Sequence, residues 1–205
     1  NMTRLLYINA SPRSDSVSER AARLFLDALK DNVDMQRIDL FQTDLPEVTD
    51  ELTSAKVKFI MGMDLTPEEE WQWAAVMSMV EQLKTADYYL MAVPMWNFGL
   101  PYKLKHYIDL VNHPSLTFTR DEGGPGGLVE GGATVIYSRG GDYSPKDGKP
   151  DPLDFQSTYF NAWLSSIGIS PVTEILVQNT MFGPDAVKDA LDAVNEQLQS
   201  LAGDL

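Results

Sequence analysis

The sequence predicts a single α/β domain over residues 1–205, in which helices cover both faces of a five-stranded parallel sheet to form a three-layer α/β/α sandwich. Two observations favour this arrangement. Short apolar runs alternate with segments of helical periodicity along the whole chain, without an internal repeat or linker. The loops rich in hydroxyl, aromatic or glycine residues directly follow apolar runs, and ligands bind at such places in parallel sheets.

Charge and composition narrow the possible functions. The formal net charge is −14, from 16 Lys and Arg against 30 Asp and Glu, so the chain repels nucleic acid and anionic membranes. It has no cysteine, which excludes disulfides, thiol catalysis and cysteine metal sites. No apolar run approaches the ~20 residues of a membrane span, and no signal-peptide core follows the N-terminus. We expect a cytoplasmic protein, and a small anionic ligand stays possible because local backbone amides can override the global charge.

The individual elements follow from the same periodicities. The predicted strands are residues 4–10, 34–40, 88–93, 133–138 and 173–178, and residues 116–119 form a short extended piece. The predicted helices are residues 19–29, 50–61, 102–111 and 153–167, with two more that begin at Thr66-Pro67 and at Gly183-Pro184-Asp185. Residues 123–127 are expected to form a flexible glycine turn. Five strands with a ligand loop after the first favour the strand order 2-1-3-4-5.

The loop after the first strand suits an anion. It reads Ser11-Pro12-Arg13-Ser14-Asp15-Ser16-Val17-Ser18, and either Ser16 or Ser18 can cap the helix that follows. Free N–H groups at the helix start, serine hydroxyls and Arg13 together could hold a phosphate. An ordinary capped helix would give the same pattern, so both interpretations stay open. The dinucleotide and Walker glycine patterns are absent.

The loop after the third strand, Pro94-Met95-Trp96-Asn97-Phe98-Gly99-Leu100-Pro101, is the most distinctive stretch. Trp96 and Phe98 offer flat apolar surface, while Asn97 offers both a donor and an acceptor. That mixture suits a planar heteroaromatic ring with polar edges. A packed loop anchored by a buried tryptophan is the equally weighted alternative.

The loop after the fourth strand carries a glycine pair. Ser138-Arg139-Gly140-Gly141 stands at the predicted carboxyl end of that strand, and glycines there let backbone N–H groups approach a ligand closely. A plain glycine turn is as good an interpretation from the sequence. The polar loop 144–152 that follows is of the kind often tied down across a site.

Two further features are interpreted as structural. The helix after Thr66 carries a wide apolar face, Trp71, Trp73, Met77 and Met79, which indicates packing or a subunit contact rather than a cofactor site. The only histidines, His106 and His113, have no neighbouring Cys or His that would complete a metal set, so no metal site is expected.

Taken together, the serine loop, the Pro94–Phe98 motif and the Ser138–Gly141 motif resemble the FMN-dependent NADH-azoreductase family, whose members are also described as FMN-dependent NADH:quinone oxidoreductases. The resemblance covers almost the whole chain. It implies a flavodoxin-like homodimer with one FMN per chain. The cofactor-binding residues that it implies are Ser11, Ser16, Val17 and Ser18 around the phosphate, Met95, Trp96, Asn97 and Phe98 beside the isoalloxazine, and Ser138, Arg139, Gly140 and Gly141 at the flavin edge. Arg120 stands where some relatives carry an aromatic residue.

The activity implied by the resemblance is a ping-pong reduction. NADH or NADPH would reduce FMN and leave, and a quinone or azo compound would then take two electrons at the same face. Because FMN supplies the hydride chemistry, no nucleophile or catalytic dyad is needed, and Asn97 is the best candidate for a catalytic side chain. The alternatives are a flavodoxin-type electron carrier without NADH turnover, which the acidic charge would suit, and a scaffold protein with a degenerate site.

Overall fold

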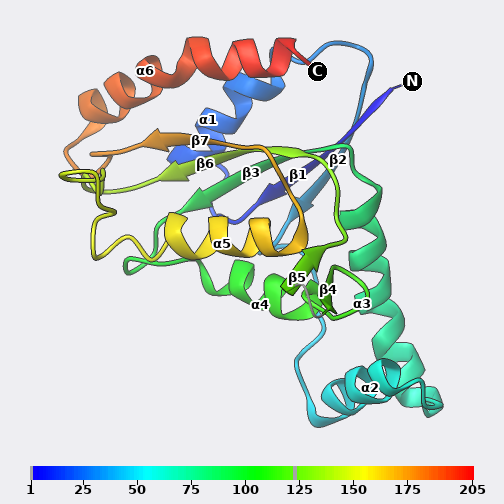
Figure 1. Ribbon diagram of the computed structural model, residues 1–205. Helices are drawn as coiled ribbons and strands as arrows, with labels where there is room; N and C mark the ends of the chain where they lie inside the picture. Colours follow the sequence, from blue (N-terminus) through cyan, green and yellow to red (C-terminus); the bar gives the residue numbers. More distant parts are fainter. Residues whose placement is uncertain (1, 122–123) are drawn as a thin grey trace.

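The fold is built on one parallel sheet whose strands lie in the order β2-β1-β3-β6-β7 (Figure 1). The structure is a computed structural model and describes residues 2–121 and 124–205. The strands of this sheet are β1 (Thr3–Asn9), β2 (Val33–Asp39), β3 (Tyr88–Pro94), β6 (Gly132–Ser138) and β7 (Val172–Val177). Counted within the sheet, the order is 2-1-3-4-5, so the predicted topology is confirmed.

Helices cover both faces of the sheet, which completes the predicted three layers (Figure 1). On one face lie α1 (Val17–Leu26) and α6 (Pro184–Gly203). On the other lie α3 (Pro67–Thr85), α4 (Tyr102–Val111) and α5 (Ser157–Ile167), while α2 (Asp50–Met61) packs against α3 and extends beyond the sheet. Within the described part of the chain, no helix is long and apolar enough to cross a membrane.

Each face of the sheet has its own apolar core, because side chains alternate along every strand. In β1, Leu5 and Tyr7 pack under α1 and α6, whereas Leu6 and Ile8 pack on the opposite side. All four are buried, which explains why this strand is a continuous apolar run in the sequence. Burial of each such large side chain contributes roughly 1.5–3 kcal/mol.

Several predicted boundaries need correction. Helix α5 begins at Ser157 rather than residue 153. The Asp154 carboxylate accepts the Ser157 N–H at 2.9 Å, so a side chain instead of a helical carbonyl bonds this backbone donor. Helix α4, by contrast, spans Tyr102–Val111 as predicted, with Pro101 as its N-cap. The prediction that Trp71 and Trp73 share one apolar face of α3 is also wrong. Trp73 is 4% exposed in the core, but Trp71 is 79% exposed, since residues two apart on a helix point in different directions.

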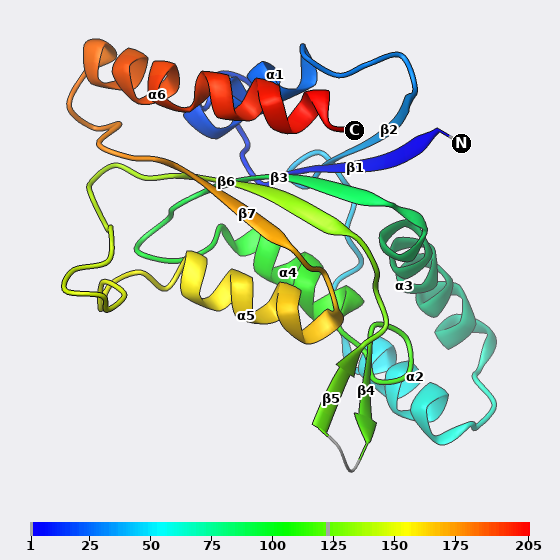
Figure 2. The same cartoon turned by 45° about the horizontal axis from the view of Figure 1, so that its top comes forward.

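A small hairpin stands apart from the main sheet (Figure 2). Strands β4 (Phe118–Asp121) and β5 (Gly124–Gly127) pair antiparallel, so the expected flexible turn at 123–127 is largely strand; Gly123 itself lies outside the described residues. At its base, β5 crosses the end of α5 with no room for a side chain. A Cβ on Gly127 would lie 2.1 Å from the backbone nitrogen of Gly168.

Candidate functional site

An open cavity of about 230 Å³ lies at the carboxyl edge of the sheet. Loops that follow β1, β3, β6 and β7 form its wall. The lining residues are Ser11, Pro12, Arg13, Asp15, Ser16, Val17, Pro94, Met95, Trp96, Ser138, Gly140 and Thr180. All three sequence motifs therefore contribute to one site, as expected for ligand-binding loops of a parallel sheet.

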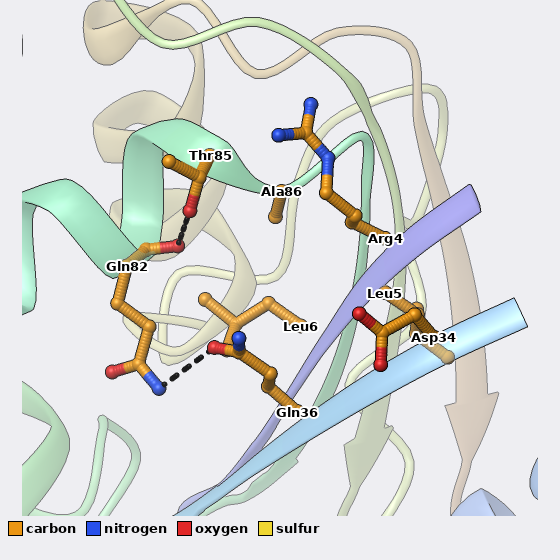
Figure 3. A pocket seen from close by; sticks show the side chains of 8 residues that line it. All are labelled: Arg4, Leu5, Leu6, Asp34, Gln36, Gln82, Thr85 and Ala86. Atoms are coloured by element: carbon orange, nitrogen blue, oxygen red, sulfur yellow. Dashed lines mark hydrogen bonds between the residues drawn. The ribbon is translucent and has the colours of Figure 1, made fainter. Parts of the chain in front are cut away.

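A second cavity, shown in Figure 3, has a different character. It lies between the first half of β1, strand β2 and the end of α3, where Gln82 donates to Gln36 across 3.2 Å. Its volume of about 20 Å³ has room for roughly one water molecule, which excludes it as a site for an organic ligand.

The serine loop ends in a capped helix. The Ser16 hydroxyl accepts the N–H of Glu19 at 3.2 Å and is the N-cap of α1. The N–H groups of Val17 and Ser18, in the first turn, have no acceptor within the helix, and this end of the helix dipole is positive. Ser16 and Val17 line the cavity, whereas the Ser18 side chain is fully buried in α1 and does not. The Ser18 hydroxyl lies 3.4 Å from the hydroxyl of Ser16, which lines the cavity.

The start of the same loop is held by a residue that the sequence analysis did not single out. Asn9, the last residue of β1, accepts the Ser11 N–H through its side-chain oxygen at 3.1 Å. Its side-chain nitrogen donates to Asp39 at 2.9 Å. These two bonds fix Ser11 at the cavity wall, while the Ser11 hydroxyl accepts the N–H of Arg13 at 3.3 Å.

The positive charge of Arg13 is already paired within the loop, which the sequence did not indicate. Its guanidinium meets the Asp15 carboxylate in a two-pronged ion pair, with both distances 3.1 Å and both side chains exposed. This contact lowers the pKa of Asp15 below its usual value. Because the two charges largely cancel, the attraction for an anion falls mainly to the helix end and the loop amides.

The Trp96–Gly99 segment is a tight turn. Trp96 and Gly99 exchange two backbone hydrogen bonds of 3.0 Å, and the residues between them, Asn97 and Phe98, have φ values of 47° and 70°. Left-handed conformations at both central positions are those of a type I′ turn. Asparagine tolerates this region, but for phenylalanine it is uncommon and costly. The strain falls on a residue beside the cavity.

Aromatic rings surround this turn. Trp96 lines the cavity and its ring centroid lies 5.4 Å from that of Phe41, which in turn meets Tyr102 edge-on at 5.4 Å. Phe98 lies outside the cavity wall and meets Tyr143 edge-on, with centroids 6.3 Å apart. Trp96 is 36% exposed, so the alternative of a loop anchored by a buried tryptophan is wrong.

The fold itself does not require glycine at positions 140 and 141. Neither Gly140 nor Gly141 has a left-handed φ. A Cβ on Gly140 would meet Met181 at 3.6 Å and one on Gly141 would meet Tyr143 at 3.5 Å, both ordinary contacts. Gly140 lines the cavity, so backbone without a side chain forms part of the cavity wall. The residues therefore fit a ligand that approaches the backbone closely.

Arg139 is turned into the protein. The residue is only 2% exposed, and its side chain donates to Gln156 and Asp154, each at 2.8 Å. Gln156 in turn donates to the carbonyl of Val93, next to the end of β3. Arg139 thus contributes to the cavity through the backbone that joins Ser138 to Gly140, and its side chain tethers the loop that follows.

The structure therefore brings together part of the predicted set. Those that line the cavity are Ser11, Ser16, Val17, Met95, Trp96, Ser138 and Gly140; those that do not are Ser18, Asn97, Phe98, Arg139 and Gly141. Thr180, which the sequence analysis missed, lines the cavity and donates its hydroxyl to the Arg139 carbonyl at 2.9 Å. Within residues 2–121 and 124–205, no cluster of His, Asp or Glu side chains could hold a metal ion.

The parallel sheet in this order, with a cleft formed by its carboxyl-end loops, defines a flavodoxin-like protein. Residues 3–202 match the family model described as the flavodoxin-like fold. The chain is 42% identical to an FMN-dependent NADH:quinone oxidoreductase of Desulfotalea psychrophila and 38% identical to one of Pseudomonas fluorescens, each over 100% of this chain and 98% of the relative. This chain belongs to the family of FMN-dependent NADH:quinone oxidoreductases.

Solved structures agree. An azoreductase from Bacillus anthracis superposes with a TM-score of 0.88 at 26% identity, over 100% of both chains. An FMN-dependent NADH-azoreductase from the same species, determined in complex with FMN, gives 0.86 at 28% identity over 98% of this chain and 100% of that one. The resemblance stated from the sequence motifs is therefore confirmed.

Proposed function

We propose that this protein binds FMN and uses NADH to reduce quinones by two electrons and azo compounds reductively. The observation that carries the proposal is the single cleft in which a helix N-terminus, the Trp96 ring and the open backbone at Gly140 meet. These parts match, in order, the phosphate, the aromatic ring and the polar edge of FMN. The names of the relatives support the same reaction.

In this proposal, Ser11, Ser16 and the first-turn amide of Val17 hold the phosphate. Met95 and Trp96 flank the ring system, and the Ser138–Gly141 backbone meets its polar edge, with Arg139 acting through its tether. Ser18 supports Ser16 from inside the helix. Asn97 and Phe98 follow Trp96 outside the cavity wall, where they would contact the second planar partner rather than the phosphate end.

FMN, when bound, supplies the hydride and two-electron chemistry. The chain contributes binding and orientation, and it needs no nucleophile for this. Trp96 offers a flat apolar surface beside one planar partner, which favours successive rather than simultaneous binding of NADH and acceptor. A ping-pong order follows. The relatives are named as NADH-dependent enzymes, which argues against the alternative of an electron carrier without NADH turnover.

We also propose that the active unit is a homodimer in the cytoplasm, where NADH is available. Large exposed apolar side chains gather on the loops and helix starts beside the cleft, namely Trp96, Phe98, Tyr102, Leu153, Phe155 and Tyr159. A second copy packed on them would remove this surface from water and close the open side of the cleft. Trp73, part of the sequence-based contact guess, is buried in the core and is not available. Light scattering of the FMN-loaded protein at micromolar concentration tests the assembly, and a fully active monomer would contradict it.

The reaction is tested by anaerobic stopped flow. Apoprotein titrated with FMN should take up one flavin per chain and bind FAD much more weakly. NADH should then bleach the bound flavin, and benzoquinone or an azo dye should restore its absorbance. If dithionite bleaches the flavin but NADH does not, the electron-carrier function replaces the enzyme function.

A further inference from the structure

A third cavity, of about 300 Å³, lies between α2, α3 and α4 and shares no lining residue with the flavin cleft. Its apolar wall includes Leu52 from α2, Trp73 and Val76 from α3, and Leu110 from α4. Lys56, Asp109 and His113 add polar groups. The volume is at the lower end for a small-molecule site, about that of one ring with a short substituent.

The charge in this cavity is unbalanced. Asp109, its carboxylate, is already bonded to Lys105, whose ammonium lies 2.7 Å from both oxygens. Lys56 is half-buried, and among the described residues no carboxylate lies within ion-pair distance of it. Burial lowers the pKa of Lys56, and the Coulombic attraction of Asp109 opposes this shift without an ion-pair contact. An unmatched cation thus lines a mostly apolar cavity in a chain of net charge −14.

Neither His113 nor Trp73 adds a second positive charge to the cavity. Burial lowers the pKa of His113 to about 4, so its ring is neutral at pH 7. Trp73 is buried, and its indole N–H has no hydrogen-bond acceptor within the described chain. One cation without an ion-pair partner is therefore offered together with apolar surface, whereas the indole nitrogen is itself buried. A carboxylate group supplies acceptors for this ammonium.

We propose that this cavity binds a small organic monocarboxylate, with the carboxylate on Lys56 and an apolar ring or short chain against Leu52, Trp73, Val76 and Leu110. A neutral molecule of the same shape would leave Lys56 unmatched, and a dianion would meet only one cation. The ligand class is thus fixed by a single positive charge at the edge of an apolar wall.

The test uses FMN-saturated protein, so that the flavin cleft is filled, and follows 4-fluorobenzoate by fluorine NMR. We expect saturable broadening of its signal, with 4-fluorobenzamide binding at least roughly tenfold more weakly because it lacks the charge. Lys56→Gln should weaken 4-fluorobenzoate binding by a similar factor, and Lys56→Arg should keep it. Lys84→Gln, an equal charge change at an exposed position of α3 outside the cavity, should leave it within about twofold.

The proposal is overturned by no binding of 4-fluorobenzoate, by equal binding of the amide, or by equal binding to Lys56→Gln and the unaltered protein. The last would place the probe elsewhere, for example over the flavin. Equal loss in Lys56→Arg and Lys56→Gln, with both variants folded by circular dichroism, would show that charge is not the determinant and would also overturn it. NADH reduction of the flavin is measured in parallel, and it should persist in Lys56→Gln because Lys56 is not part of the cleft.

Discussion

The guanidinium of Arg139 and the carboxylate of Asp154 form a buried ion pair with an Nη2–Oδ2 distance of 2.8 Å. Their side chains are 1% and 8% exposed. The same carboxylate accepts the N–H of Ser157 at 2.9 Å and its hydroxyl at 2.6 Å. The pair thereby joins the end of β6 to the start of α5 and closes the long loop between them beside the flavin cleft.

Breaking this pair from one side should be costly. Asp154→Asn leaves the Arg139 charge buried without its partner, so we expect the free energy of unfolding to fall by about 3–5 kcal/mol, measured by urea denaturation of the apoprotein. FMN affinity should fall as well, because the Ser138–Gly141 backbone loses its tether. Lys188→Gln, which breaks the exposed pair of Lys188 with Asp192, is the control and should change neither quantity measurably. Unchanged FMN affinity in a destabilised Asp154→Asn would confine the pair to a structural role.

Two capping residues separate the stability effect of Ser16 from its effect on FMN. Ser16→Ala and Thr49→Ala each remove the hydroxyl that caps a helix, α1 and α2 respectively, and each should cost about 0.5–2 kcal/mol of stability. Only Ser16 lines the cleft, so only Ser16→Ala should also weaken FMN binding, by about 1.5–3 kcal/mol if its hydroxyl donates to the phosphate. Fluorescence titration of apoprotein with FMN gives the affinities. Equal affinities in the two variants would argue against a phosphate contact.

Asn97 can be tested without loss of its turn. Glycine adopts the left-handed conformation at no steric cost, so Asn97→Gly should keep folding and FMN affinity while removing the amide. We expect turnover of NADH with benzoquinone to fall. Asn97→Val, which resists φ near 47°, should lower stability as well as turnover. Full activity of Asn97→Gly would show that the amide has no part in the reaction.

His113 should make stability depend on pH. Its folded-state pKa, lowered by burial to about 4, lies below the unfolded value of 6.5, so the unfolded chain binds the proton more readily between these values. The histidine's contribution is therefore constant above pH 6.5 and is lost as the pH falls from 6.5 towards 4, by about 2–3 kcal/mol in all. Urea midpoints from pH 4 to 8 should show this slope. His113→Gln should flatten it and His106→Gln, the matched control, should leave it; a slope unchanged in His113→Gln would contradict the assignment.

The sequence predicted the sheet and its order because buried parallel strands are continuous apolar runs, and β1, β3 and β6 are buried along most of their length. It also placed the three site loops correctly, since loop position follows from strand order alone. Helix boundaries that depend on a single side chain could not be predicted from the periodicity of the sequence. Asp154 delays the start of α5 by a hydrogen bond that periodicity does not register.

Side-chain direction was the main limit within the site. Arg139 and Ser138 are neighbours in one motif, yet the Arg139 side chain is buried in the protein while Ser138 lines the cleft. Successive residues at a strand end point to opposite sides. Asn97 favours the left-handed conformation, but Phe98 stands where a type I′ turn usually has glycine, so the composition did not indicate this turn. Asn9 was read only as part of a strand, although it holds Ser11 in place.

The crossing of Gly127 over Gly168 has a consequence for how this chain can vary. Backbone meets backbone there so closely that even one methyl group on either residue would force the hairpin and α5 apart. Gly168 also has a φ of 103°, which other residues rarely adopt. The base of the hairpin is thus fixed by two positions without side chains, so a substitution at either one would have to be accompanied by a shift of β5 relative to α5.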